Sequence, residues 1–273
     1  MAREGAAVIK TPAQIAKMRE AGRILAGALS AMGKAVRPGI PTVVLDRVGE
    51  DYLRSHGARP SFKGYRPPGA REAYPAAVCV SVNDVVVHGV PSERVVVNEG
   101  DIVGLDIGVC VGGCHADGAT TVEVGEVSPE VAVLVAATRE ALTAAVAASQ
   151  LGGRVRDISA AIQAAVEDRQ APGRPRMACI RDLAGHGVGL SVHEAPSVAN
   201  FADDTGGRMK LREGMTLAIE PMSSLGAAFT QRCPVDNWGM RTIDGSWSAH
   251  FEHTVLITRE GPDVLTVAGS EAW

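Results

Sequence analysis

Gly100–Val124, GDIVGLDIGVCVGGCHADGATTVEV, contains two apolar runs joined by a pair of glycines. Gly112-Gly113 tolerates the positive φ angles of a two-residue turn, so the stretch predicts an antiparallel β-hairpin about this pair. The residues on either side of the glycines then face each other. Because side chains alternate between the two faces of a strand, Asp106 and Asp117 fall on the same face.

Asp106 lies within the apolar run 102–107, which predicts that its carboxylate is buried. Glu220 and Glu252 also lie in or at the end of short apolar, strand-like runs. A buried carboxylate has to be paired, hydrogen-bonded or bound to a metal, because removing its charge from water is costly. A solvated strand face, the usual explanation of paired aspartates, does not suit such apolar surroundings.

The helical pattern occurs twice along the chain. A capping residue followed by proline predicts long helices starting at Pro12 and Pro129, and shorter helices follow Thr42 and a capping Asp157. The starts of the long helices are 117 residues apart and those of the short helices 115. This matched restart predicts two structurally similar halves, each contributing two of the carboxylates.

Strands and loops are expected between the helices. Strand-like runs occur at 76–82, 95–97, 101–111 and 114–124, and irregular loops are expected at 60–75 and 171–176.

Composition excludes several classes of protein. Hydrophobic residues form 46% of the 273-residue chain, which excludes a disordered protein. The net charge of −4, without a basic block, gives no indication of nucleic acid or an anionic membrane as partner. No secretory signal or bilayer-length apolar run is evident, so we expect a cytoplasmic protein. The five scattered cysteines predict buried free thiols in a reducing compartment.

Convergence of four carboxylates in one core requires positive charge, and two divalent cations would balance it. Oxygen ligands suit Mg²⁺, Mn²⁺ or Fe²⁺, and one imidazole extends the range to Co²⁺ and Zn²⁺. His186, within Gly185–Gly189 (GHGVG), is the best candidate imidazole because its glycines permit close backbone approach. Neither an H-E-x-x-H zinc motif, a serine nucleophile elbow nor a P-loop is present.

These residues, in this order, resemble the metal ligands of the methionine aminopeptidases. The resemblance covers nearly the whole chain, and its spacing is similar to that of the type I form. The ligand set is Asp106, Asp117, His186, Glu220 and Glu252. The matching strings are NDVVVHGVP (83–91), LDIG (105–108), GHGVG (185–189), HEAP (193–196), IEPM (219–222) and FEHT (251–254).

The resemblance implies an α/β pita-bread fold, with two pseudo-symmetric halves around a central antiparallel sheet. It implies one catalytic domain over 1–273, with halves at about 11–125 and 128–258. Asp106 would chelate one metal, His186 and Glu220 the other, and Asp117 and Glu252 would bridge the pair.

The resemblance also assigns residues outside the metal ligands. His88 and His193 would hydrogen-bond the substrate and the developing oxyanion. An apolar pocket would bind the methionine side chain, with walls from Phe62, Tyr65, Tyr74, Cys79 and Trp238. Two departures concern this pocket: the segment 66–73 is longer than in short type I members, and Val192 replaces a common aromatic, which predicts a more open wall.

The implied activity is removal of the N-terminal methionine from nascent polypeptides when the second residue is small and uncharged. The implied cofactors are two divalent ions per chain, drawn from Co²⁺, Mn²⁺, Fe²⁺, Zn²⁺ or Ni²⁺. The expected enzyme is a cytoplasmic monomer that meets its substrates at the ribosome. Two alternatives remain: another pita-bread aminopeptidase of the Xaa-Pro type, or a catalytically inactive binding protein of the same fold.

Overall fold

The computed structural model describes residues 6–67, 71–168, 175–202 and 207–267. Its helices are α1 (Pro12–Ala35), α2 (Thr42–Ser55), α3 (Pro129–Ala148) and α4 (Val155–Gln163), which continues into a π-helical turn, Ala164–Asp168. Both long helices begin as predicted. The side chains of Thr11 and Ser128 cap them by accepting hydrogen bonds from the N–H groups of Gln14 and Val131.

The start of α4 differs from the prediction. Asp157 lies inside the first turn, and its carboxylate accepts the N–H of Arg154, the residue that precedes the helix. Asp157 therefore completes the first turn from within and is not the cap itself.

The hairpin forms in the predicted register. Val111 faces Cys114 across the turn, and the same pairing continues to Asp106 opposite Ala119. Each arm divides into two short strands where the backbone twists. Two antiparallel three-stranded sheets result, of order β2-β4-β7 and β1-β5-β6. Their strands are β1 (Arg59–Pro60), β2 (Cys79–Val82), β4 (Ile102–Asp106), β5 (Val109–Val111), β6 (Cys114–Ala116) and β7 (Ala119–Glu123).

Other predicted strands and loops need correction. Residues 95–97 form no strand, because their backbone pairs with the segment before α2: the Val97 N–H donates to Ile40, and Thr42 N–H to Val95. The run 76–82 is a strand only from Cys79. The loop 60–75 is irregular in its described part after β1, and most of the predicted loop 171–176 lies outside the described residues.

The second half contributes the larger sheet. Its antiparallel order is β10-β9-β11-β16-β17, and smaller sheets have the orders β15-β12-β8 and β13-β14-β3. The strands are β3 (Val85–Val87), β8 (Ala178–Cys179), β9 (Ala184–Gly187), β10 (Glu194–Ala199), β11 (Thr216–Ile219), β12 (Met222–Ser224), β13 (Thr230–Arg232), β14 (Met240–Thr242), β15 (Ser248–His250), β16 (His253–Thr258) and β17 (Gly261–Val264).

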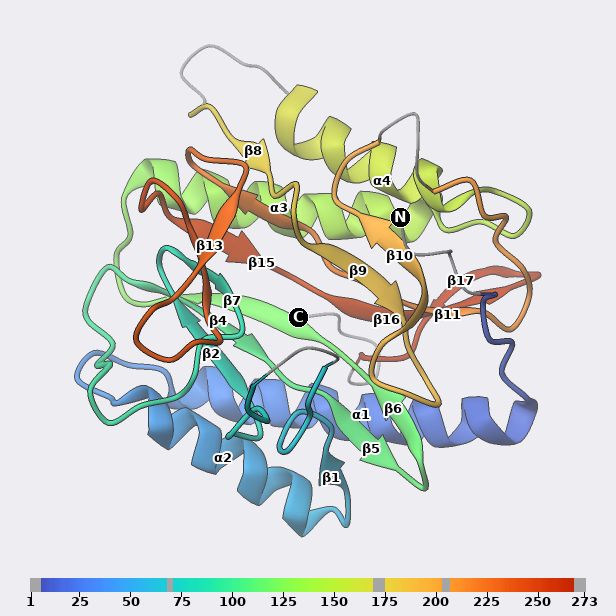
Figure 1. Cartoon of the computed structure of the whole chain (residues 1–273), viewed down its shortest axis with the longest axis horizontal. Coiled ribbons are helices and arrows are strands. Elements are labelled where there is room, and N and C mark those ends of the chain that lie inside the picture. The colour runs from blue at the N-terminus through green and yellow to red at the C-terminus, as the bar shows by residue number, and fades with distance from the viewer. Residues whose placement is uncertain (1–5, 68–70, 169–174, 203–206, 268–273) are drawn as a thin grey trace.

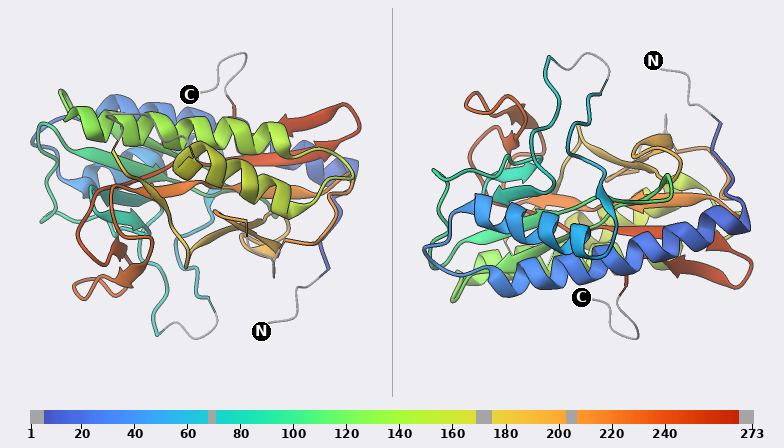
Figure 2. Two further views of the ribbon diagram at one scale, coloured as in Figure 1. Left: turned by 90° about the horizontal axis from the view of Figure 1, so that it is seen from above. Right: turned by 90° about the horizontal axis from the view of Figure 1, so that it is seen from below.

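The helices pack according to half. α1 and α2 contact each other and the strands of the first half, whereas α3 and α4 contact each other and strands of the second (Figure 1). Figure 2 shows α1 and α3 along one side of the strands, with the loop around residue 65 and β13 on the other. Each half has its own apolar core; Leu25 and Leu105 are fully buried in the first, and Leu134 and Leu217 in the second. Burial of each such leucine contributes about 1.5–3 kcal/mol.

By length and composition alone, α3 is the one helix among the described residues apolar enough to cross a membrane. Its buried face, which includes Leu134 and Leu142, packs into the second core.

The two halves meet where β7 and β16 begin. The N–H of Glu252 donates to the carbonyl of Ala119 at 2.9 Å, and the reverse hydrogen bond is 3.3 Å long. The Asp117 N–H also donates to Oγ1 of Thr254 at 2.8 Å. The acidic residues of the first half are thereby held beside those of the second. All five cysteines are free thiols; four are buried, as predicted, and Cys233 is half-buried.

Candidate metal and peptide site

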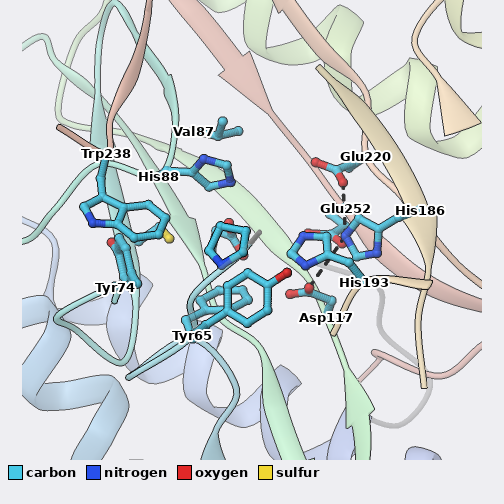
Figure 3. A pocket seen from close by; sticks show the side chains of 14 residues that line it. Tyr65, Tyr74, Val87, His88, Asp117, His186, His193, Glu220, Trp238 and Glu252 are labelled. Atoms are coloured by element: carbon cyan, nitrogen blue, oxygen red, sulfur yellow. Dashed lines mark ion pairs between the residues drawn. The ribbon is translucent and has the colours of Figure 1, made fainter. Parts of the chain in front are cut away.

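A single cavity of about 320 Å³ collects every site residue that the sequence predicts. Its walls come from both halves of the fold, and Figure 3 shows acidic groups on one side and aromatic rings on the other. The lining residues are Phe62, Tyr65, Pro67, Tyr74, Cys79, Val87, His88, Asp106, Asp117, His186, His193, Glu220, Trp238 and Glu252. Only Pro67 and Val87 in this set were not predicted.

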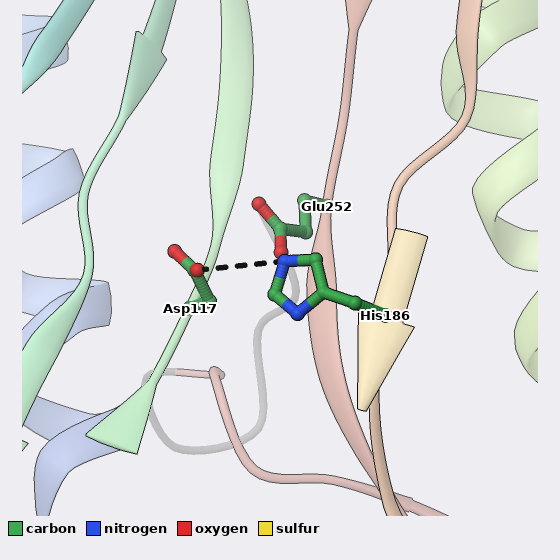
Figure 4. A group of neighbouring side chains, drawn as sticks. All are labelled: Asp117, His186 and Glu252. Carbon is green, nitrogen blue, oxygen red and sulfur yellow. Dashed lines mark ion pairs between the residues drawn. The ribbon is translucent and has the colours of Figure 1, made fainter. Parts of the chain in front are cut away.

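Three of the predicted metal ligands form a compact group. Asp117, His186 and Glu252 each offer a ligand atom, and these atoms lie within 4.8 Å of one another (Figure 4). Asp117 follows β6, His186 lies in β9, and Glu252 precedes β16. The remaining two candidates, at the ends of β4 and β11, line the same cavity: Oε1 of Glu220 is 3.5 Å from His186 Nε2.

The glycines beside His186 permit this approach, as predicted. A Cβ atom on Gly185 would lie 2.5 Å from the carbonyl oxygen of Ala218 in β11. A Cβ atom on Gly187 would lie 2.3 Å from that of Ala195 in β10. β9 can therefore fit between its two neighbours only without side chains at these positions.

Among the described residues, the carboxylates of this site have only histidines as ion-pair partners. Burial raises the pKa values of Asp117 and Glu220 to about 8, and repulsion by Glu220 adds to the shift of Asp117. Burial and repulsion by the neighbouring carboxylates raise the pKa values of Asp106 and Glu252 well above their usual range. Within the described chain, Oδ1 of Asp106 and Oε1 of Glu252 are buried without a hydrogen-bond partner. Buried carboxylate oxygens with no partner beside an imidazole are a donor set that fits divalent metal ions.

The imidazoles are held as neutral groups. Burial lowers the pKa of His186 to about 3 and that of His88 to about 4. A neutral imidazole offers one nitrogen as acceptor or metal ligand and the other as donor. Nδ1 of His186 lies 2.9 Å from the carbonyl of Gly187; donation from Nδ1 to this carbonyl leaves Nε2 free to act as a ligand.

His193 lies at the open side of the acidic group, by which we mean the carboxylates of Asp106, Asp117, Glu220 and Glu252. Its ring centroid is 4.2 Å from that of His186 and 5.1 Å from that of Tyr65. His193 belongs to the exposed end of the loop after β9, so its ring faces whatever enters the cavity.

The opposite wall is apolar. Phe62, Tyr74, Cys79 and Val192 are buried in one cluster, with Tyr65 and Trp238 packed against it. The Tyr74 hydroxyl donates to the carbonyl of Gly89 at 2.9 Å, which satisfies its polar group within this wall. Its ring meets Trp238 edge-on at 5.2 Å.

The sequence analysis missed His250, which lies in β15 with its side chain buried. Its Nε2 is 3.4 Å from Oε2 of Glu220 and has no hydrogen-bond partner among the described residues. Burial lowers its pKa to about 3. The available signal was its position two residues before Glu252 in a strand-like run, which suggests a shared face.

Comparison with known proteins identifies the family to which this chain belongs. Residues 16–259 match the metallopeptidase family M24, and this match covers most of the chain. The chain belongs to metallopeptidase family M24. Among M24 relatives, the methionine aminopeptidase of Clostridium acetobutylicum is 40% identical over 260 residues, covering 95% of this chain and 98% of that protein. This similarity places the M24 chain among the methionine aminopeptidases, which are metal-dependent hydrolases.

Solved M24 structures confirm the pita-bread fold. The crystal structure of methionine aminopeptidase from Thermotoga maritima is 41% identical, with a TM-score of 0.88, covering 96% of this chain and all of that one. The prolidase of Pyrococcus furiosus is 22% identical, with a TM-score of 0.74; this chain covers 66% of its length, and the likeness extends to the fold alone. The comparisons thus favour the methionine aminopeptidase over the Xaa-Pro alternative.

Proposed function

We propose that this protein removes N-terminal methionine from polypeptides whose second residue is small and uncharged. One observation carries the proposal: the acidic group and the apolar wall line the same cavity. A methionine side chain against the wall would bring its peptide carbonyl toward the acidic group. The curated relatives named methionine aminopeptidase support the same activity.

The metal-binding role is assigned to five residues. Asp106 would chelate one divalent ion, His186 and Glu220 a second, while Asp117 and Glu252 would bridge the two. When bound, such ions lower the pKa of a water molecule and polarise the scissile carbonyl. We propose two ions per chain, chosen from Co²⁺, Mn²⁺, Fe²⁺, Zn²⁺ or Ni²⁺.

The neighbouring histidines would act on the substrate. His193, beside His186 and open to the cavity, would donate a hydrogen bond to the carbonyl oxygen as that oxygen gains negative charge. His88 lies on the wall side and would hydrogen-bond the substrate backbone. Glu220 would take part in moving a proton from the attacking water to the leaving amine.

The pocket would determine which N-termini are accepted. Phe62, Tyr74, Cys79 and Val192 would surround the thioether with apolar surface, and Trp238 would close one side. The cavity of about 320 Å³ has room for a methionine side chain, and the restriction to a small second residue is part of the proposal.

We further propose that residues 1–273 act as one catalytic domain with halves at about 11–125 and 128–258. The proposed setting is a cytoplasmic monomer whose partners are nascent N-termini at the ribosome. Sedimentation of the protein alone tests whether it is a monomer, and sedimentation with ribosomes tests whether it meets nascent N-termini there. A stable dimer, or failure to bind ribosomes that carry nascent chains, would contradict them.

The decisive experiment compares three peptides. Metal-stripped protein is titrated separately with Mn²⁺, Fe²⁺, Co²⁺, Zn²⁺ and Ni²⁺ and then offered Met-Ala-Ser, Met-Lys-Ser and Ala-Pro-Ser. We expect hydrolysis of Met-Ala-Ser alone. Equal cleavage of Met-Lys-Ser would contradict the proposed restriction to a small second residue. Preference for Ala-Pro-Ser would favour the Xaa-Pro alternative. No cleavage with any metal would favour a binding protein.

A further inference from the structure

A buried ion pair includes the residue that follows His193 in the chain. Nζ of Lys10 is 2.5 Å from Oε2 of Glu194, and the two side chains are only 1% and 6% exposed. Lys10 precedes α1, whereas Glu194 immediately follows His193 and begins β10. The pair therefore joins the N-terminal segment to the loop that carries His193.

The second oxygen of Glu194 organises that loop. Oε1 accepts the N–H groups of Leu190 at 2.6 Å and Ser191 at 3.0 Å. One carboxylate thus binds a lysine on one side and closes the turn 189–194 on the other. Hydrogen bonds to ionised groups are about twice as strong as neutral ones, so this turn depends heavily on the charge of Glu194.

The lysine is itself held in place. Its backbone N–H donates to the carbonyl of Gly214, and Ile9 pairs with Met215 at the start of β11. Nζ also donates to the carbonyl of Val8 at 3.1 Å. The N-terminal segment is therefore fastened to the chain just before β11, the strand that Glu220 follows.

The lysine stem also packs closely on the turn. A Cβ atom on Gly189 would lie 2.2 Å from Cε of Lys10, and Gly189 has a φ of 150°, which side chains disfavour. The carbonyl of Gly189 accepts the N–H of His115 in β6. On the opposite side of the turn, Val192 is buried in the apolar wall. The turn that carries His193 is therefore fixed by contacts with Lys10 and His115 and by burial of Val192 in the apolar wall.

We propose that Lys10 and Glu194 form an anchor that positions the His193 ring over the acidic group. Lys10 then acts on the reaction through His193 and is a positioning residue. This inference rests on the proposed peptidase activity, because the benefit of a fixed His193 ring lies in the hydrogen bond it donates. A displacement of about 1 Å at such a donor can lower the rate about 100-fold.

The test replaces the pair as a unit, since removal of one partner would leave a buried charge. Lys10→Met combined with Glu194→Gln keeps an acceptor for the Leu190 and Ser191 amides. We expect kcat on Met-Ala-Ser to fall about 10- to 100-fold, KM to change less than about threefold, and the bound metal to stay the same.

Adding His193→Ala to the anchor variant, Lys10→Met with Glu194→Gln, distinguishes an effect exerted through His193 from a purely structural role of the pair. If the anchor acts through His193, the triple variant has the kcat of His193→Ala, with no further loss. Multiplication of the two losses would overturn the proposal, as would a normal kcat in the anchor variant. The matched control replaces an exposed pair, Arg259→Met with Glu213→Gln, whose members are 74% and 52% exposed; it should leave kcat unchanged.

Hydrogen exchange tests the anchor without any activity. In metal-free protein, the amides of Leu190 and Ser191 should exchange faster in the anchor variant than in wild type and in the exposed-pair control. Unchanged protection would overturn the anchor. If wild-type protein fails to hydrolyse Met-Ala-Ser with any metal, the proposed function fails, and this exchange measurement still decides whether the anchor exists.

Discussion

Nε2 of His250 lies 3.4 Å from Oε2 of Glu220, while Oε1 of the same carboxylate faces His186 at 3.5 Å. Glu220 is thus placed between two imidazoles from different strands, only one of which is a predicted ligand. The second one lies beside the carboxylate, a position in which partners of metal ligands orient them and adjust their affinity.

Replacing His250 should therefore weaken metal binding. In His250→Leu, Glu220 loses the group that orients it, and we expect metal affinity about 10- to 100-fold lower. Calorimetric titration of metal-stripped protein with Mn²⁺ measures this change. His56→Leu, at an exposed histidine after α2, is the control and should bind like wild type. Unchanged affinity in His250→Leu would show that Glu220 needs no second partner.

The proposed bridging and chelating roles predict different results for substitutions of Asp117 and Asp106. Asp117→Asn removes charge from both proposed metal positions, so it should abolish activity and reduce binding of both ions. Asp106→Asn should mainly weaken one of the two. Metal content after dialysis, measured by elemental analysis, distinguishes them. Retention of two ions with normal affinity by Asp117→Asn would refute its bridging role.

His193→Ala should keep its metal and lose turnover. A hydrogen bond to a developing oxyanion strengthens in the transition state, so its loss lowers kcat more than it raises KM. Removal of one such donor costs about 100- to 1,000-fold in kcat, or roughly 3–4 kcal/mol. Steady-state kinetics beside metal calorimetry measure both effects. Loss of one metal equivalent would make His193 a ligand, and a near-normal kcat would make it structural.

Stability of the metal-free protein should fall as the pH rises from 7 to 8.5. Asp117 and Glu220, with pKa values of about 8, keep protons that the unfolded chain releases near pH 4, so raising the pH favours unfolding until they ionise. Buried His186 and His250, with pKa values of about 3, act oppositely, but only up to the unfolded histidine value of about 6.5. The carboxylates therefore dominate above pH 7.

Thermal unfolding with a chelator, repeated with excess Mn²⁺, measures this dependence. Each pH unit over which the folded protein alone keeps one proton costs about 1.4 kcal/mol, so these two carboxylates should give a loss on the order of 2–3 kcal/mol. Metal should reverse the slope, because it binds the ionised carboxylates. The control, Asp117→Asn combined with Glu220→Gln, should make the slope shallower without metal, because only Asp106 and Glu252 then keep their protons. A metal-free midpoint that rises from pH 7 to 8.5 would contradict the charge analysis.

Local sequence predicted the fold best where hydrogen bonds are local. The Gly112-Gly113 turn determines the hairpin register, and the caps at Thr11 and Ser128 start the long helices. The apolar run 95–97 misled because its β propensity is satisfied by a loop partner rather than a sheet. Asp157 misled because a carboxylate can close a first turn from inside the helix.

The predicted site residues all line one cavity. Six of them lie in strings that the family resemblance identifies, whereas Asp117 and the pocket residues were matched by position alone. The residues around them escaped prediction for a physical reason. Lys10 meets Glu194 across 184 positions of sequence, and His250 meets Glu220 from another strand. No periodicity or spacing encodes such pairs; they exist only when the strands are assembled.

The backbone bridge between Ala119 and Glu252 has a consequence for synthesis of the chain. Asp106 and Asp117 are made early, but their partners across this bridge appear only near the C-terminal end. A chain still being translated, or one cut short before Glu252, lacks a complete set of proposed ligands. Retention of tightly bound metal therefore reports that the chain has been made at least as far as Glu252 and that its two halves have docked, which makes it an assay of maturation as well as of binding.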